Sequence, residues 1–324
     1  MPKKVPKIVR EIQNNPPEEI NFAFQRNISY SQMSIFRSCA HRWKLQYKDK
    51  IKKFDSSIHT VFGTSIHESL QHYLDVAYEK SFAAANREID LNEDFQHRFI
   101  SEYQSQYKKN KNTHFSDAGE MREFFEDGVA ILDWFKKKRS RYFNKKGTYL
   151  VGCEVPIVIA PNKMFSNVLY MGYLDVVTYN ERTDTFKIID IKTSTKGWNS
   201  YAKKDENKQF QLLLYKQFFS EQYNIPLDKI EIEFFIVKRK VLSWDDSNIM
   251  SPHQAYRVQT FSPPIGKIKL GKAKKAITNF ISECFNTDGS IKNKNYIKTP
   301  SKWTCNFCPF KEEQELCGAG LDFL

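Results

Sequence analysis

The spacing of hydrophobic positions changes character partway along the chain. Before residue 148, apolar side chains recur every three or four positions, which predicts helices over 60–79, 90–108 and 117–140. After it, apolar and polar positions alternate in short runs, which predicts strands in TYLVGCEVPIVIA, SNVLYMGYLDVVTYN and DTFKIIDIKTS. The polar link NERTDT joins the last two strands, so we expect them to form an antiparallel hairpin.

The remaining segments add a crossover helix, a strand and a basic helix. We predict a helix over 205–222, a strand in KIEIEFFIVKRK and an amphipathic helix in GKAKKAITNFISECF. Near the N-terminus, either Ser29 or Ser31 caps a short helix that ends near Cys39. Helices followed by a sheet with a crossover helix indicate an α/β core with a helical extension.

The charge balance indicates a polyanionic partner. The 324 residues include 50 Lys and Arg against 38 Asp and Glu, and the net charge of +12 favours nucleic acid over a surface that is basic only for solubility. No apolar run is long enough to span a membrane, and no apolar stretch follows the basic start. We therefore expect no signal peptide and a cytoplasmic, reducing location, in a bacterial cell or a virus-infected host.

Three charged residues on neighbouring strands indicate a metal site. Asp190 and Lys192 share one face of their strand, and the hairpin brings Asp175 beside Asp190. Two carboxylates brought together repel each other unless a cation lies between them, and oxygen ligands suit Mg²⁺ or Mn²⁺. The Ile191 backbone carbonyl is a further candidate ligand, and Lys192 can orient the attacking water or stabilise the pentavalent phosphorus. The alternative is an edge strand with one solvated face.

Two residues outside the hairpin are further candidates. His67 offers a nitrogen donor, and it follows Gly63 by one helical turn, so the glycine would clear space beside it. The alternative is a capping or core histidine. Glu154 starts a strand and either lies near the metal or is solvated, while Glu68 faces another way on the helix and is expected to be structural.

These positions follow the order of a known motif series. The series consists of GxxxH (Gly63 and His67), a Glu (Glu154), GxxD (Gly172 and Asp175), DxK (Asp190 and Lys192) and QxxxY (Gln211 and Tyr215). Over about residues 29–318 the chain resembles the RecB-like branch of the PD-(D/E)XK nuclease superfamily. The resemblance implies a restriction-endonuclease-like core, with a mixed central sheet flanked by helices, an N-terminal helical extension and a cysteine-rich C-terminal tail.

The resemblance also implies roles for these residues. The implied catalytic residues are His67, Asp175, Asp190 and Lys192, and the first three of these also bind metal. Lys192 assists the water. Gln211 and Tyr215, one turn apart on a helix, contact DNA or support the site together with Glu154. The alternative for this helix face is packing on the sheet.

The same resemblance divides the chain into an arm and one domain. Residues 1–27 are polar and proline-bearing, and we expect a flexible arm there. Residues 28–324 are expected to form a single RecB-like nuclease domain. Its parts are a mainly helical part over 28–147, the catalytic sheet and crossover helix over 148–240, and a basic helix with a metal-cluster tail over 241–324.

Cysteines near both ends of the chain indicate a second metal centre. Cys305 and Cys308 form a CxxC pair, Cys317 follows, and Cys39 is the candidate fourth ligand. This layout resembles the [4Fe–4S] cluster of AddB-type and CRISPR-adaptation nucleases, apart from a longer last gap. Zinc, with His41 completing the site, is the alternative. The bound metal or cluster would hold the C-terminal tail against the first helix.

Together these features predict a metal-dependent DNA exonuclease that acts on single-stranded ends, in recombination, repair or replication. Late lysines and arginines, with Trp198, Tyr201 and Trp244 near the site strands, suit single-stranded DNA. The sequence has no GxxxxGK[ST] loop, so a separate helicase or recombinase is the expected partner. The alternatives are an endonuclease or flap or junction resolvase, a non-catalytic DNA-binding iron–sulfur module, and RNA as the substrate.

Overall fold

The computed structural model describes residues 5–243, 247 and 254–318. These residues group into two compact units, and each is described by itself. The first unit comprises Met1–Pro16, Ser56–Val155 and Tyr173–Pro264. The second comprises Pro17–Asp55, Pro156–Gly172 and Ile265–Leu324. Within the described part of the chain, no helix is both long enough and apolar enough to cross a membrane.

The helices of the first unit confirm the predicted helical periodicity. Aspartate side chains start three of them, because Asp90, Asp117 and Asp205 each accept a hydrogen bond from a main-chain N–H of the first turn. The helices are α1 (Lys7–Asn14), α4 (Ile58–Glu79), α5 (Phe82–Glu88), α6 (Leu91–Lys109), α7 (Ala118–Lys138), α8 (Ser200–Lys204) and α9 (Glu206–Tyr223), with short 3₁₀ turns at Arg139–Arg141 and Leu227–Lys229.

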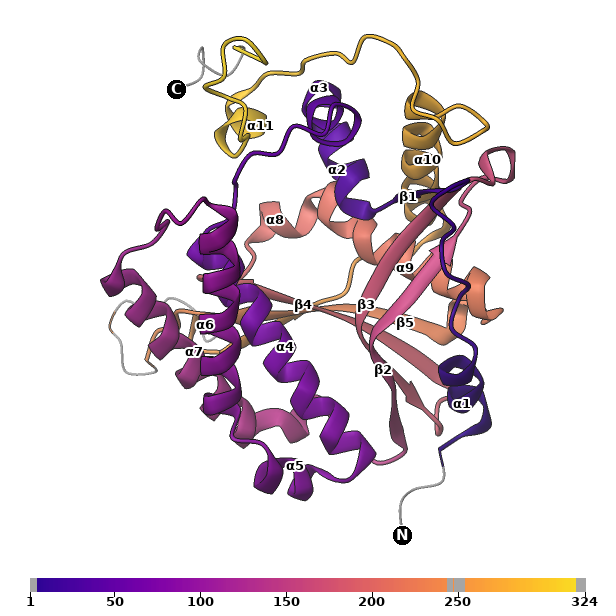
Figure 1. Cartoon of the computed structure of the whole chain (residues 1–324). Helices are drawn as coiled ribbons and strands as arrows, with labels where there is room; N and C mark the ends of the chain where they lie inside the picture. The colour runs from indigo at the N-terminus through magenta and orange to yellow at the C-terminus, as the bar shows by residue number, and fades with distance from the viewer. Residues whose placement is uncertain (1–4, 244–246, 248–253, 319–324) are drawn as a thin grey trace. The chain divides into compact units, whose positions relative to one another are not determined.

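The sheet is mixed, which confirms the predicted α/β class. Five of its six described strands lie wholly or partly in the first unit: β2 (Thr148–Ile159), β3 (Val168–Asn180), β4 (Thr185–Ser194), β5 (Ile230–Lys238) and β6 (Val258–Phe261), of which β2 and β3 continue into the second unit. β3 and β4 form the predicted antiparallel hairpin, and β2 pairs with β3. β4 and β5 run parallel, so α9 is the crossover helix between them, and β6 pairs antiparallel with β5 (Figure 1).

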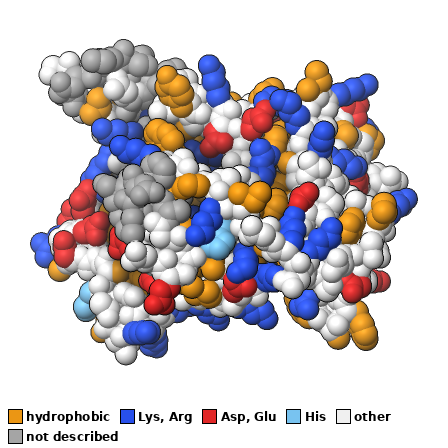
Figure 2. Space-filling model, turned by 90° about the horizontal axis from the view of Figure 1, so that it is seen from above, with side chains coloured by type: hydrophobic (Ala, Val, Ile, Leu, Met, Phe, Trp, Pro, Cys, Tyr) orange, Lys and Arg blue, Asp and Glu red, His pale blue; other side chains and the backbone are white. Residues whose placement is uncertain are grey.

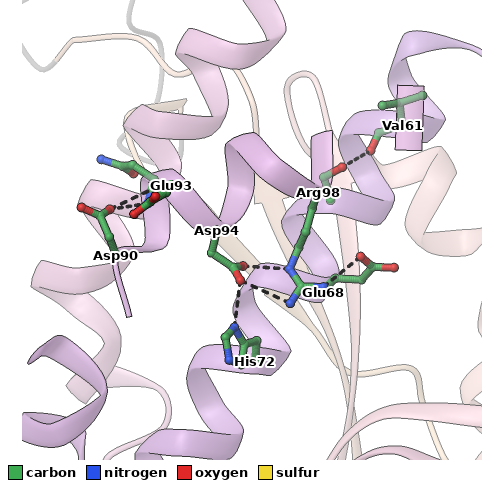
Figure 3. A network of polar contacts seen from close by, with 9 residues as sticks. Val61, Glu68, His72, Asp90, Glu93, Asp94 and Arg98 are labelled. Carbon is green, nitrogen blue, oxygen red and sulfur yellow. Dashed lines mark hydrogen bonds and ion pairs between the residues drawn. The ribbon is translucent and has the colours of Figure 1, made fainter. Parts of the chain in front are cut away.

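A polar network holds α4 against α6 (Figure 3). Asp94 accepts a hydrogen bond from Arg98 Nε at 2.8 Å and lies 2.9 Å from His72 Nδ1. Arg98 also donates to Glu68 Oε2 at 3.1 Å. Glu68 is thus engaged between the two helices, in the structural role that the sequence indicated.

Gly128 of α7 marks the closest packing in the aromatic core. A Cβ at this position would lie 2.3 Å from two ring atoms of Phe95, a distance that real side chains do not tolerate. We expect Gly128→Ala to lower the free energy of unfolding by roughly 1–3 kcal/mol, because the core is overpacked. Gly271 lies in a helix with open space around it, so Gly271→Ala is the control, with a gain of up to about 1 kcal/mol. Urea denaturation measures both, and an unchanged midpoint for Gly128→Ala would contradict the packing.

The second unit is built on short helices and an aromatic cluster. Its elements are β1 (Arg26–Ile28), α2 (Tyr30–Ser38), α3 (Ala40–Trp43), a π turn at Lys44–Lys48, a 3₁₀ turn at Lys163–Phe165, α10 (Lys267–Cys284) and α11 (Lys302–Asn306). Ser29 is the residue that caps α2, through Gln32 N–H. β1 runs parallel to the start of β3. Buried Trp43 packs against Phe280 and Tyr296, which joins α3, α10 and the tail.

The N-terminal segment differs from the expected flexible arm. Lys7–Asn14 forms the helix α1, in which Val9 and Ile12 are buried. Gln13 Nε2 donates to the Val151 main-chain oxygen at 3.0 Å, so the helix is tied to β2. The amphipathic pattern KIVREIQN explains why a short helix forms after Pro6. The single nuclease domain from residue 28 onward stays a prediction.

Candidate metal-binding active site

Three side chains from three elements of the first unit converge on one point. His67 comes from α4, Glu154 from β2 and Asp175 from β3, and one ligand atom of each lies within 4.8 Å of the others. His67 Nε2 lies 3.2 Å from Asp175 Oδ2 and 3.9 Å from Glu154 Oε1. Among the described residues, this is the one group of three or more His, Cys, Asp or Glu side chains close enough to share a metal ion.

The β3–β4 hairpin sets the position of Asp175. Val176 pairs with Ile189, so the next residues along the two strands, Asp175 and Asp190, stand opposite each other as the sequence indicated. Asp175 Oδ2 accepts a hydrogen bond from the Ile191 N–H at 2.7 Å, which fixes the carboxylate against β4. The role of the Ile191 carbonyl as a ligand stays a prediction.

Asp190 is buried beside this group without being one of its three members. It exposes 1% of its surface, and Lys192 Nζ lies 2.7 Å from Asp190 Oδ2, so the two charges share one face of β4 as the alternation predicts. Asp190 Oδ1 is buried and has no hydrogen-bond partner among the described residues. A buried carboxylate oxygen of this kind is available to a proton, a water or a cation.

The pKa shifts show that the site attracts positive charge. Burial raises the pKa of Asp190; Lys192 opposes the rise and Asp175 adds to it. Burial alone would lower the pKa of Lys192, but the Asp190 and Asp175 carboxylates outweigh burial and raise it, so the ammonium keeps its proton at neutral pH. The pKa of His67 is likewise raised against burial, first by its hydrogen bond to Asp175. For Lys192 and His67, nearby carboxylates stabilise the protonated form.

Gly63 allows α4 to approach β4. A Cβ at Gly63 would lie 3.1 Å from Thr193 Oγ1, so the space that the glycine clears is filled by a strand residue. The prediction that it clears space beside His67 therefore needs a correction. The glycine lets the helix come close to the sheet, and this approach carries His67 to the carboxylates.

The crossover helix supplies Gln211 and Tyr215. Gln211 Nε2 donates to the Tyr215 hydroxyl at 3.3 Å, as expected for residues one turn apart. Tyr215 exposes 6% of its surface. Burial raises its pKa, and the Asp190 carboxylate adds to the rise, so the tyrosine lies close enough to interact electrostatically with the site and keeps its proton.

Sequence reasoning missed Gln71. This residue lies one turn after His67 on α4, and its Nε2 donates to Glu154 Oε1 at 2.6 Å and to the Asp175 main-chain oxygen at 2.8 Å. An uncharged residue between motif positions carries no signal of its own. The spacing of four residues from His67 is the one clue, since it places both side chains on the same helix face.

The four cysteines of the predicted cluster surround one cavity of the second unit. The cavity has a volume of about 20 Å³ and is lined by Cys39, Cys305, Cys308 and Cys317. Burial raises the pKa of Cys308, and Cys317 and Cys39 raise it further, so these thiols interact. His41 also lines the cavity, but its Nε2 lies 2.9 Å from the Leu316 oxygen and is engaged there.

Three of the late basic residues are engaged in ion pairs within the protein. Arg239 and Lys240 form ion pairs with Asp127 of α7 at 2.7 and 2.9 Å. In the second unit, Lys294 pairs with Glu283. Figure 2 shows Lys and Arg side chains across the face in view, interspersed with Asp and Glu.

The aromatic candidates differ in their exposure. Trp198 packs on Phe234, with ring centroids 4.8 Å apart, and is half-buried. Tyr201 of α8 is 83% exposed, so its ring is available to a ligand. Trp244 lies outside the described residues.

Comparison with known proteins agrees with this geometry. The family model described as the PD-(D/E)XK nuclease superfamily matches residues 27–313. Among solved structures, the one described as "Crystal structure of SSO0001" is 13% identical, with a TM-score of 0.36, over 94% of this chain and 90% of that chain. No curated protein sequence matches. Because the family model spans most of the chain, the protein belongs to the PD-(D/E)XK nuclease superfamily, whose members are metal-dependent nucleases.

Proposed function

We propose that this protein is a metal-dependent DNA exonuclease of the RecB-like branch, acting on single-stranded ends. The observation that carries the proposal is the convergence of His67, Glu154 and Asp175, with the Asp190–Lys192 pair beside them, in a chain of this superfamily. The donor set of one imidazole and several carboxylates fits Mg²⁺ or Mn²⁺. The unpartnered Asp190 Oδ1 is a further available donor.

Each residue then has a defined task in phosphodiester hydrolysis. His67, Glu154, Asp175 and Asp190 would hold the ion, which when bound would supply an activated water and neutralise phosphate charge. Lys192 keeps its proton because of the adjacent carboxylates, so it acts as a fixed cation toward the phosphate. Tyr215 remains a neutral hydrogen-bonding group next to the carboxylates.

The preference for single strands rests on residues that follow the catalytic strand. β4 ends at Ser194, and exposed Lys196, Tyr201 and Lys204 come directly after it in the same unit. An exposed ring flanked by ammonium groups suits an unpaired base and its phosphates. A separate helicase or recombinase would supply the ends, since the sequence has no phosphate-binding loop for an ATP motor.

The test is digestion of end-labelled linear DNA, circular single-stranded DNA and linear RNA, each with Mg²⁺ or Mn²⁺. We expect the linear DNA strand alone to be degraded, and the order of product release gives the polarity. Cutting of the circle would replace the exonuclease by an endonuclease or resolvase. Degradation of RNA alone would show that RNA, and not DNA, is the substrate. Tight DNA binding without any cleavage would indicate a non-catalytic DNA-binding module.

We further propose that the four cysteines hold a [4Fe–4S] cluster. Two distant segments place Cys39 and the three late thiols around one cavity, which suits a cluster with thiolate ligands. A single zinc ion would draw thiolates to roughly 3.8 Å from one another, given Zn–S bonds of about 2.3 Å. A [4Fe–4S] cluster would hold its thiolates farther apart than a zinc ion does, and metal analysis distinguishes the two.

We expect the purified protein to be brown, with absorbance near about 400 nm and roughly four irons per chain. Cys308→Ala removes one ligand and is expected to abolish the colour. Cys284→Ala is the matched control, because Cys284 is fully buried in α10 and does not line the cavity, and this variant keeps the colour. Iron and zinc analysis accompanies the spectra. A colourless wild type with one zinc per chain would show that the cluster is wrongly assigned.

A further inference from the structure

A buried glutamine links the helix and the two strands that carry the candidate metal ligands. Gln71 exposes 6% of its surface. Its amide nitrogen donates to a carboxylate oxygen of Glu154 and to the main-chain oxygen of Asp175. Both partners are acceptors, so the amide must turn its NH₂ group toward them, and both N–H bonds are used.

The backbone of β2 has an unusual conformation where it contacts this glutamine. Successive side chains of a regular strand point to opposite faces, yet consecutive Cys153 and Glu154 both contact Gln71. Cys153 Sγ donates to the Gln71 main-chain oxygen at 3.8 Å. Glu154 has a φ of +51°, in the left-handed region that residues other than glycine rarely adopt. The unusual φ turns the Glu154 carboxylate toward α4, where Gln71 receives it.

We propose that Gln71 is a positioning residue for metal binding: its amide fixes the Glu154 carboxylate in the orientation in which Glu154, His67 and Asp175 hold a divalent cation together. This inference rests on the proposed metal site. A carboxylate that ligates a metal is itself oriented by a hydrogen bond, and the loss of such a partner costs about 10- to 100-fold in metal affinity or activity. The hydrogen bond engages Oε1, the oxygen that faces His67 at 3.9 Å, and a carboxylate oxygen that accepts one N–H bond keeps a further lone pair for the ion.

A neutral donor is the chemical group that this position requires. Glu154, Asp175 and Asp190 already place three carboxylates around the site, so a fourth acid would add repulsion and remove both N–H donors. A lysine or arginine would introduce a positive charge that competes with the metal for the same carboxylates. An amide supplies two hydrogen bonds without either charge.

The experiment compares Mn²⁺ binding to the full-length wild type and to Gln71→Met, which keeps the side-chain length and removes the donors. Isothermal titration calorimetry and Mn²⁺ EPR measure affinity without DNA. We expect a Kd that is about 10 to 100 times weaker in Gln71→Met. We also expect DNA cleavage to need correspondingly more Mn²⁺ and to recover most of the wild-type rate at saturation, because the catalytic groups remain.

Gln209→Met is the matched control. Gln209 is also a buried helical glutamine of the first unit, and its Nε2 donates to the Lys203 main-chain oxygen, remote in sequence from the metal ligands. This variant is expected to bind Mn²⁺ as the wild type does. If Gln71→Met fails to fold, Gln71→Glu serves in its place, with the same weakening expected.

A double-mutant cycle separates positioning from a general effect on folding. In the Glu154→Ala background, Gln71→Met has no carboxylate left to orient, so we expect no further loss of Mn²⁺ affinity. A wild type that binds Mn²⁺ together with an equally tight Gln71→Met would overturn the role of Gln71 alone. A wild type that binds no Mn²⁺ would overturn the metal site and this inference together.

Discussion

Replacing Asp190 by asparagine is expected to abolish DNA cleavage and to leave DNA binding nearly unchanged. Asp190 lies buried between Asp175 and Lys192, and its Oδ1 has no partner in the described part of the chain. An amide of the same shape cannot neutralise a divalent ion or hold the Lys192 ammonium. We expect the rate to fall at least about 1,000-fold, or about 4 kcal/mol of transition-state stabilisation.

Single-turnover cleavage with Mn²⁺ measures the rate, and fluorescence anisotropy without metal measures binding. Asp184→Asn is the control on the same hairpin, since Asp184 is half exposed, pairs with Lys229 and has a left-handed φ that asparagine tolerates. It is expected to cleave normally. An Asp190→Asn protein with wild-type activity would remove Asp190 from the active site.

Lys192→Met is expected to lower the cleavage rate by about 100- to 1,000-fold at saturating metal, with little change in metal affinity. The Asp190 and Asp175 carboxylates raise the pKa of Lys192, so at neutral pH it carries a proton and acts through its charge and not as a base. Lys192→Arg keeps the charge in a larger group, and we expect it to retain more activity than the methionine variant.

Lys187 of the same strand provides the matched control. Its Nζ lies 2.7 Å from Glu233 Oε1, outside the metal site, so Lys187→Met is expected to cleave at the wild-type rate. Rates are compared under single-turnover conditions over a range of Mn²⁺ concentrations. Equal rates for Lys192→Arg and Lys192→Met would argue against a role for the charge.

The elements with strong periodicity could be predicted from the sequence, and the shortest ones could not. The alternation through Asp175 and Asp190 predicted the β3–β4 hairpin, which brings the two residues onto neighbouring strands. β1 and β6 have three and four residues, which is too few for a pattern to emerge. The helix α1 was missed because the prolines on either side of it and its own polar residues resemble those of a disordered leader.

The site shows the same division between local and long-range information. His67 and Glu154 could be named as candidates, but their convergence depends on packing between α4 and β2. Arg239 is one of the late basic residues expected to suit DNA, but it pairs with Asp127, more than a hundred residues earlier in the chain. Charges that meet only in the folded protein leave no trace in local sequence.

The left-handed backbone at Glu154 has a consequence for how sequences of this kind diverge. A glutamate there carries a conformational cost of about 1–2 kcal/mol that the fold alone would avoid by using glycine. Chemistry and foldability therefore favour different residues at one position. In a lineage that no longer needs catalytic activity, replacement of this glutamate by glycine is the expected first change. When related chains are compared, the residue at this position can thus serve as a marker that distinguishes active nucleases from inactive ones.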